Sequence, residues 1–156
     1  MFRFVLIALT IQCVFSRCQD GWTLNKGFCY GFSADFLTWN DAAAMCLVYG
    51  ARLVQIDSLE KNNWLASEMA ARQMVNIWVG GSCRFHTNLW VWVPSYKQMK
   101  PFTNWYPGQP DNPLGEQCIE IHQGRQYKWN DLACGYALRY ICEKSVTASS
   151  ASLPEK

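Results

Sequence analysis

Cysteine content constrains this chain most, because every disulfide that forms removes conformations from the unfolded chain. There are 8 cysteines among 156 residues. Their spacing contains no paired Cys-x-x-Cys unit of the kind that holds zinc. Such a content in a chain of this size is typical of a secreted domain that is held together by disulfides. The length gives room for a single domain with its own hydrophobic core.

The first residues read as a secretory leader. The apolar stretch 4–11 follows Arg3, and the small residue Ser16 suits signal peptidase cleavage, so we expect residues 1–16 to be a signal peptide. Cys13 would leave with it, and the seven cysteines that stay cannot all pair within one chain. No later stretch approaches the roughly twenty apolar residues of a membrane span. The sequence therefore predicts a secreted, extracellular protein without a membrane span.

Charge excludes one class of partner. The full chain has a formal net charge of +2, and loss of Arg3 with the leader would lower it to +1. A nucleic-acid-binding protein needs a basic surface that neutralises phosphates. We therefore expect no nucleic-acid partner.

Helical patterns come first along the chain. Thr38 can cap a helix that Gly50 ends. The apolar positions of this helix share one face: Trp39, Ala42, Ala43, Cys46 and Leu47. A second helix is predicted from Asp57 or Ser58 to about Arg72, with Leu65 and Met69 on one stripe.

Short apolar pieces bounded by turn residues follow the helices, and they predict strands at 77–79, 89–93, 118–121 and 139–142. This order indicates an α+β fold. The segment 94–115 holds five prolines and predicts a long loop pinned by aromatic side chains. The polar tail 145–156 predicts a disordered end.

Five oxygen-bearing side chains lie within 23 residues of one another in sequence. They are Gln109, Asp111, Glu116, Asn130 and Asp131. Carboxylate and amide oxygens are the ligands that Ca²⁺ prefers in proteins. The pattern therefore predicts a calcium site.

The chain resembles a secreted C-type lectin, and the resemblance spans about 18–143. Its landmarks are Gly21-Trp22, Cys29-Tyr30, Trp78-Val79-Gly80-Gly81, Asn104-Trp105, Gln109-Pro110-Asp111, Cys118, Trp129-Asn130-Asp131-Leu132, Cys134 and Cys142-Glu143. Within the family the chain is most similar to molluscan perlucin-like lectins. The resemblance implies a C-type lectin domain over 17–144, in which two helices flank small antiparallel sheets and a long calcium-binding loop.

Three disulfides are implied by the same resemblance: Cys18 with Cys29, Cys46 with Cys142, and Cys118 with Cys134. Cys83 is left over. One reading makes it an interchain disulfide that links a homodimer and adds avidity to weak binding. The other makes it a buried free thiol, since cysteine packs as a small hydrophobe.

The family's site implies what the five oxygen-bearing residues do. They would bind one Ca²⁺, and the same side chains would bind two neighbouring hydroxyls of a sugar. The tripeptide Gln109-Pro110-Asp111, whose proline the family holds cis, is associated with galactose or N-acetylgalactosamine. Two departures broaden that expectation: the stretch 112–115 lacks an aromatic residue, and the loop is one residue shorter than in many relatives. Stacking on a sugar would have to come from elsewhere, for example from Tyr127.

An accessory calcium site of many relatives is predicted to be absent. Cys83, Asn112 and Gln117 stand where that site would need carboxylates. The sequence therefore predicts a single calcium ion per domain.

The sequence features bear on four classes of function. The first is a lectin that recognises glycans on microbes, in innate immunity, or on the animal's own secretions. The second is a calcium-binding protein of shell or extracellular matrix, which perlucin-like relatives suggest but no acidic run supports. An enzyme is not expected, because the sequence offers no nucleophile with a spaced base. A calcium-independent protein-binding module usually loses the calcium residues, and all five are kept here.

Overall fold

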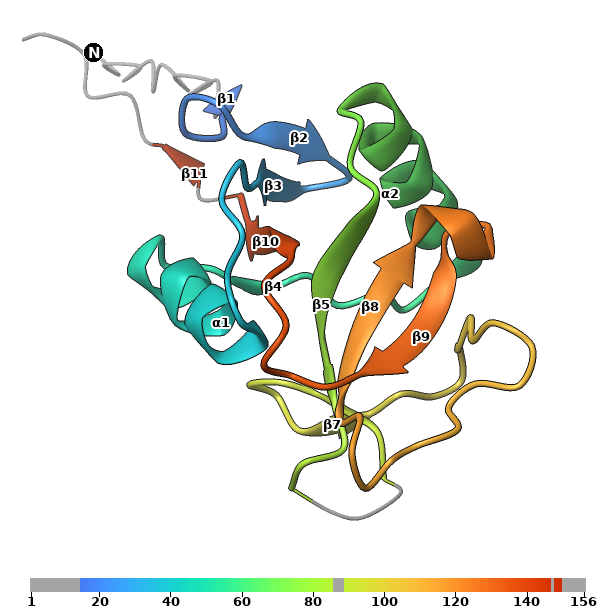
Figure 1. Ribbon diagram of the computed structural model, residues 1–156. Helices are drawn as coiled ribbons and strands as arrows, with labels where there is room; N and C mark the ends of the chain where they lie inside the picture. The colour runs from blue at the N-terminus through green and yellow to red at the C-terminus, as the bar shows by residue number, and fades with distance from the viewer. Residues whose placement is uncertain (1–14, 86–88, 147, 150–156) are drawn as a thin grey trace, which may run out of the picture.

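The structure is a computed structural model that describes residues 15–85, 89–146 and 148–149. Strands and helices alternate irregularly along the chain (Figure 1). In the first half they are β1 Phe15–Ser16, β2 Thr23–Asn25, β3 Phe28–Phe32, α1 Trp39–Val48, β4 Arg52–Leu53, α2 Leu59–Ala71 and β5 Asn76–Ser82. In the second half they are β6 Val91–Trp92, β7 Lys97–Gln98, β8 Cys118–His122, the 3-10 turn η1 Gln123–Arg125, β9 Lys128–Leu132, β10 Arg139–Ser145 and β11 Ala148–Ser149.

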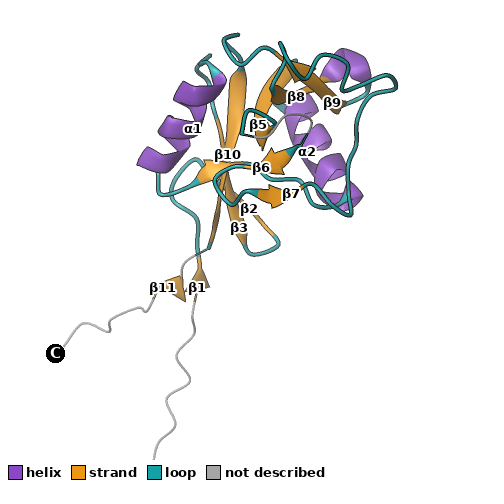
Figure 2. Cartoon of the chain, turned by 90° about the horizontal axis from the view of Figure 1, so that it is seen from below, coloured by secondary structure: helices purple, strands orange, loops and turns teal. Residues whose placement is uncertain are grey.

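One sheet joins most of the strands. Its main path runs β2-β3-β10-β5-β6-β7, β4 pairs with β10, and β8 pairs with both β5 and β9. All pairs are antiparallel except β10 with β5, where Tyr140 lies opposite Trp78. The two helices lie on opposite sides of this sheet (Figure 2). The predicted α+β class is confirmed.

Both helices begin at the residues that the sequence predicts. Thr38 caps α1 by accepting a hydrogen bond from Asp41 N, and Gly50 follows it with φ +64°. Ser58 caps α2 by accepting from Lys61 N. Local side chain to backbone bonds of this kind satisfy N–H groups that the first turn leaves free.

The predicted apolar face of α1 is only partly buried. Trp39, Ala42 and Cys46 are buried, but Leu47 is 63% exposed. Helical spacing shows only that residues lie on the same face of a helix. No part of the described fold covers the C-terminal end of this face, where Leu47 lies. On α2 the predicted core positions Leu65 and Met69 are fully buried.

Three disulfides join the pairs that the resemblance implied. Cys46–Cys142 closes a sequence separation of 96 and ties α1 to β10. A loop of that length stabilises by about 4–5 kcal/mol in the chain-entropy picture. Cys118–Cys134 joins the start of β8, just after the predicted calcium loop, to the segment after β9. It therefore holds the end of that loop next to the strand that carries Asn130 and Asp131.

The predicted loop 94–115 contains only one short strand, β7, and is otherwise irregular. Phe102 and Trp105 pack against the Trp129 ring with centroids 5.7 and 5.8 Å away. The Trp129 indole N–H donates to Asn62 of α2 at 2.8 Å. Trp129 is fully buried and directly precedes Asn130 and Asp131, so the core fixes the strand that carries those two side chains.

The first and last described strands, β1 and β11, pair with each other (Figure 2). The predicted signal peptide 1–16 lies outside the described residues except for β1. Of the predicted disordered tail, Ser145 ends β10 and Ala148–Ser149 form β11. Residues 147 and 150–156 lie outside the described residues, and the domain boundaries stay predictions.

Candidate functional site

Three of the predicted ligands meet at the long loop. Carboxylate oxygens of Asp111, Glu116 and Asp131 all lie within 4.8 Å of one another. Asp111 is exposed, Glu116 is half-buried and Asp131 is fully buried. Among the described residues this is the only group of three or more acidic, histidine or cysteine side chains close enough to hold a metal ion.

Asp131 also holds the loop that carries the other two carboxylates. Its oxygens accept hydrogen bonds from the backbone N–H groups of Asn112 at 2.9 Å and Asp111 at 3.3 Å. The Glu116 N–H donates to Asn112 O at 2.7 Å and closes a tight turn. The peptide bond between Gln109 and Pro110 is cis, as the resemblance implied. The loop is therefore fastened to β9 at the point where its ligands begin.

Gln109 lies at the edge of the same cluster. Its side-chain amide donates to Asp111 Oδ2 at 3.1 Å. Its Oε1 is buried, and it has no hydrogen-bond partner in the described part of the chain. A buried acceptor without a donor is costly, and a cation at the cluster would supply the missing partner.

Asn130 stands apart from these four by its contacts. It lies on β9 next to Asp131 and is 6% exposed. Its Nδ2 donates to Oε1 of Glu120 on β8 at 3.0 Å. No contact between Asn130 and the three clustered carboxylates is among the described interactions, so its ligand role stays a prediction.

Glu120 is a further residue beside the cluster, and the sequence pattern did not point to it. It is 4% exposed on the otherwise apolar strand Cys118–His122, where it accepts hydrogen bonds from Asn130 and from Asn76 of β5. The available signal was an acidic residue inside an apolar strand, because a buried carboxylate requires partners.

The cluster is strongly negative. The pKa of Glu116 is raised above its ordinary value by burial first, and then by the charges of Asp131 and Asp111. Arg125 opposes this shift, and its guanidinium lies 5.3 Å from the Tyr106 ring. Hard oxygen ligands crowded together with a surplus of negative charge suit a cation such as Ca²⁺, so these residues fit that ion.

The remaining predicted positions lie beside the cluster or away from it. Cys83 is 1% exposed, is not in a disulfide, and its Sγ is 3.6 Å from Pro113 O. A thiol so covered cannot reach a second chain without displacement of the loop, which favours the buried-thiol reading. The Cys83 N–H donates to Gln117 O. These two residues, which stand where an accessory calcium site would need carboxylates, are therefore neighbours in the fold. Tyr127 is half-buried against the core, and its carbonyl oxygen accepts from Asn62.

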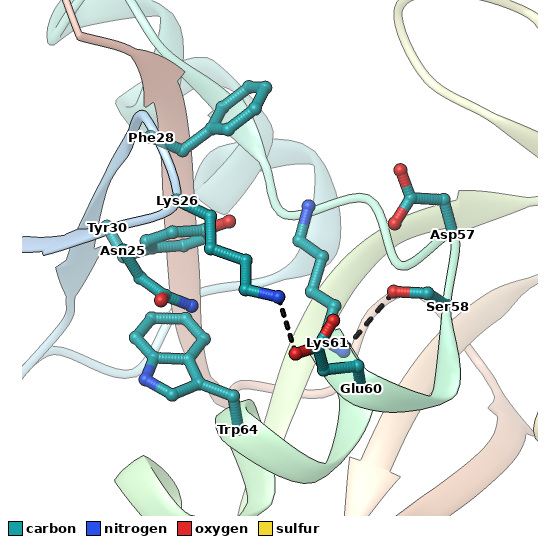
Figure 3. Close-up of a pocket in the computed structure, with 9 residues that line it drawn as sticks. All are labelled: Asn25, Lys26, Phe28, Tyr30, Asp57, Ser58, Glu60, Lys61 and Trp64. Atoms are coloured by element: carbon teal, nitrogen blue, oxygen red, sulfur yellow. Dashed lines mark hydrogen bonds and ion pairs between the residues drawn. The ribbon is translucent and has the colours of Figure 1, made fainter.

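A second pocket lies between the β2–β3 turn and the start of α2 (Figure 3). Its volume is about 300 Å³, and its lining residues are Asn25, Lys26, Phe28, Tyr30, Asp57, Ser58, Glu60, Lys61 and Trp64. Here Lys26 pairs with Glu60 at 2.5 Å, and Lys61 pairs with the buried Glu143 at 2.6 Å. Both ammonium groups have carboxylate partners within the protein, so this pocket lacks the charge imbalance of the loop.

The family model described as the Lectin C-type domain matches residues 36–144. The chain belongs to the C-type lectin family. It is 32% identical to a perlucin-like protein of the mussel Mytilus galloprovincialis over 91% of this chain and 93% of that protein. This confirms the perlucin-like resemblance.

Solved structures of other C-type lectin domains share the fold. The carbohydrate-recognition domain of the mouse scavenger receptor C-type lectin superposes with a TM-score of 0.76 at 30% identity, over 85% of this chain and 99% of that domain. A calcium-independent type II antifreeze protein has a TM-score of 0.76 at 28% identity, over 84% of this chain and 96% of its own. The same fold thus serves a calcium-independent protein, and calcium dependence has to be argued from the residues.

Family membership places this lectin among non-enzymatic carbohydrate-binding proteins, in agreement with the sequence. None of the helices in the described residues combines the length and apolar character needed to cross a membrane.

Proposed function

We propose that this C-type lectin is secreted and binds carbohydrate through one Ca²⁺ held by Gln109, Asp111, Glu116, Asn130 and Asp131. One observation carries the proposal. Three carboxylates lie within 4.8 Å of one another beside the buried Gln109 Oε1, which has no partner within the described chain. Protein interiors rarely leave such groups uncompensated, and a cation would satisfy all of them together.

Bound calcium would supply coordination positions to which two neighbouring sugar hydroxyls can bind. The chain's own residues would fix the orientation of the sugar. Carboxylates such as Asp111 and Glu116 can only accept hydrogen bonds from hydroxyls, whereas the amide of Gln109 can donate to them. Exposure of Asp111 leaves it accessible to a ligand, while full burial of Asp131 keeps the loop in place.

We further propose a bias toward galactose and N-acetylgalactosamine with broad tolerance of other sugars. The order of amide and acid in Gln109-Pro110-Asp111 supports the bias, because it sets the order of donor and acceptor around a diol. The stretch 112–115 offers no aromatic surface, and its exposed apolar side chain is Leu114 at 79%. Without stacking, binding of a single sugar is expected to be weak.

A calcium titration joined to a glycan array tests the site. Isothermal titration is expected to show one ion per domain, with a Kd in the range of about 10⁻⁴ to 10⁻³ M that extracellular modules often have. Glycan binding is expected in millimolar calcium and should disappear with chelator. Absence of calcium binding would refute the proposed site. Chelator-sensitive binding led by mannose or glucose would keep the site and refute the bias.

The biological setting we propose is recognition of glycans on microbes or on the animal's own secretions. Amino-terminal sequencing of protein secreted from animal cells should begin at Arg17. Association with calcium carbonate in the absence of glycan binding would favour the matrix alternative. A non-reducing gel is expected to show a monomer-sized band and no dimer-sized band, because burial of Cys83 disfavours a disulfide-linked homodimer.

A further inference from the structure

Glu120 is a buried carboxylate on the strand beside the proposed calcium site. It does not belong to the cluster of Asp111, Glu116 and Asp131. It lies at the centre of the β8–β9 pair, directly opposite Asn130. Its Oε1 accepts from Asn130 Nδ2 and its Oε2 accepts from Asn76 Nδ2, each at 3.0 Å. At 4% exposure, the carboxylate is held from both sides by strands β5 and β9.

This contact sets the orientation of the Asn130 amide. An ionised carboxylate only accepts hydrogen bonds, so the amide nitrogen and not the oxygen must face Glu120. Asn130 Oδ1 therefore points away from Glu120. Because calcium binds oxygen and is repelled by an N–H donor, only this orientation can make Asn130 a ligand.

We propose that Glu120 is the positioning residue for Asn130: it holds the amide nitrogen so that the oxygen stays available to the cation. Asn76 in turn holds the second oxygen of Glu120 and limits rotation of its carboxylate. The inference rests on the proposed calcium site and assigns a role to a residue outside the predicted ligand set. Outer-shell partners of this kind typically change metal affinity by about 10–100-fold when they are removed.

The variant Glu120→Leu keeps a similar volume and removes both acceptors. It is expected to weaken calcium binding about tenfold in isothermal titration. Asn76→Ala is the matched control, because it removes one hydrogen bond from Glu120 and leaves the Asn130 contact intact. Its calcium Kd is expected to change less than twofold. Urea unfolding without calcium reports whether each variant is folded, and Glu120→Met, which also lacks a strong acceptor, replaces Glu120→Leu if the latter is not.

A double-mutant cycle separates positioning from simple loss of charge. If Glu120 acts through Asn130, its substitution should weaken calcium binding less than twofold in the Asn130→Ala background. A charge effect would persist in both backgrounds. The inference is overturned if the two substitutions add, or if the folded Glu120 variant binds calcium as wild type does. If wild-type protein itself binds no calcium, the proposed site fails before any variant is compared.

Discussion

Two carboxylate sites in this lectin differ in how their charge is compensated. Glu143 is fully buried, and it accepts hydrogen bonds from Lys61 at 2.6 Å, Gln55 N at 3.0 Å and Arg52 at 3.2 Å. The cluster of Asp111, Glu116 and Asp131 brings three negative groups together with backbone N–H donors and the opposing charge of Arg125. The negative charge of Glu143 is compensated by partners within the chain, whereas the negative charge of the cluster is compensated only in part.

That difference separates a structural carboxylate from the proposed calcium ligands. A buried charge is retained when it is paired and hydrogen-bonded, as Glu143 is. Like charges that are held together without full compensation raise one another's pKa and are typical of functional sites. Composition cannot distinguish the two, because both consist of ordinary acidic residues.

The largest expected effect comes from leaving Glu143 without its lysine. Lys61→Met should lower the free energy of unfolding by about 3 kcal/mol, since the buried Glu143 loses its shortest charged contact and keeps only Arg52 and Gln55 N as partners. Urea denaturation measures this. Lys26→Met is the control in the same pocket, because the Lys26–Glu60 pair is mostly exposed and should contribute less than about 1 kcal/mol. Equal effects of the two variants would contradict the structural role of Glu143.

Next in size is the loss of a ligand at the loop. Asp131→Asn should weaken calcium binding by more than about 100-fold, beyond the range of outer-shell substitutions, and should abolish calcium-dependent glycan binding. Isothermal titration and a glycan array measure the two effects. Asp57→Asn, at an exposed carboxylate of the second pocket, should change neither. If Asp131→Asn binds calcium with unchanged affinity, Asp131 is not a calcium ligand, and the contrast with the structural carboxylate Glu143 fails.

Acidification should weaken calcium binding through Glu116. Its pKa is raised in the folded protein by burial and by its acidic neighbours, so a proton competes with the metal. The calcium Kd should rise by up to about tenfold per pH unit below that pKa. Glu116→Gln should bind calcium more weakly and lose this pH dependence.

Stability without calcium should respond to Glu116 in the opposite direction. A carboxyl group whose folded pKa is raised destabilises the folded state when it is charged, and protonation relieves that cost as pH falls through the folded pKa. In chelator, acidification toward that pKa should therefore raise the contribution of Glu116 to the free energy of unfolding. Chemical denaturation of wild type and Glu116→Gln across the same pH range measures it. A Glu116 contribution that falls as pH is lowered would contradict the raised pKa.

The smallest expected effect comes from the exposed rim of the loop. Leu114→Trp would place an aromatic ring in the stretch 112–115, where the described chain has none. Stacking should tighten galactose binding by about 0.5–1.5 kcal/mol, while the calcium Kd stays within twofold of wild type. Titration with galactose and with mannose, each in saturating calcium, measures the change. Equal tightening for both sugars would argue against a galactose-specific geometry.

Helix limits could be predicted because their signals are local. Thr38 with Asp41, and Ser58 with Lys61, are three residues apart, so capping depends on the chain nearby. The same helical spacing placed Leu47 on the apolar face of α1, but this side chain is exposed. Whether a stripe is covered depends on other elements, and local sequence does not contain that information.

At the site, sequence predicted the kinds of ligand and the tertiary structure determined their contacts. Asp111, Glu116 and Asp131 could be named because their residue types and order match the family. Glu120 could not, since its role arises from cross-strand pairing with Asn130 and Asn76. The same holds for Lys61 and Glu143, which are 82 residues apart in sequence.

The sequence by itself determined the family, the disulfide-dependent character of the domain and the candidate oxygen ligands, because landmark residues and chemical types are written in order along the chain. Only the tertiary structure decided which acidic groups are compensated, where Cys83 is covered and which way Asn130 faces. The physical reason is that compensation of charge acts over a few ångströms of space. Groups that distant segments bring that close are known only once the chain has folded.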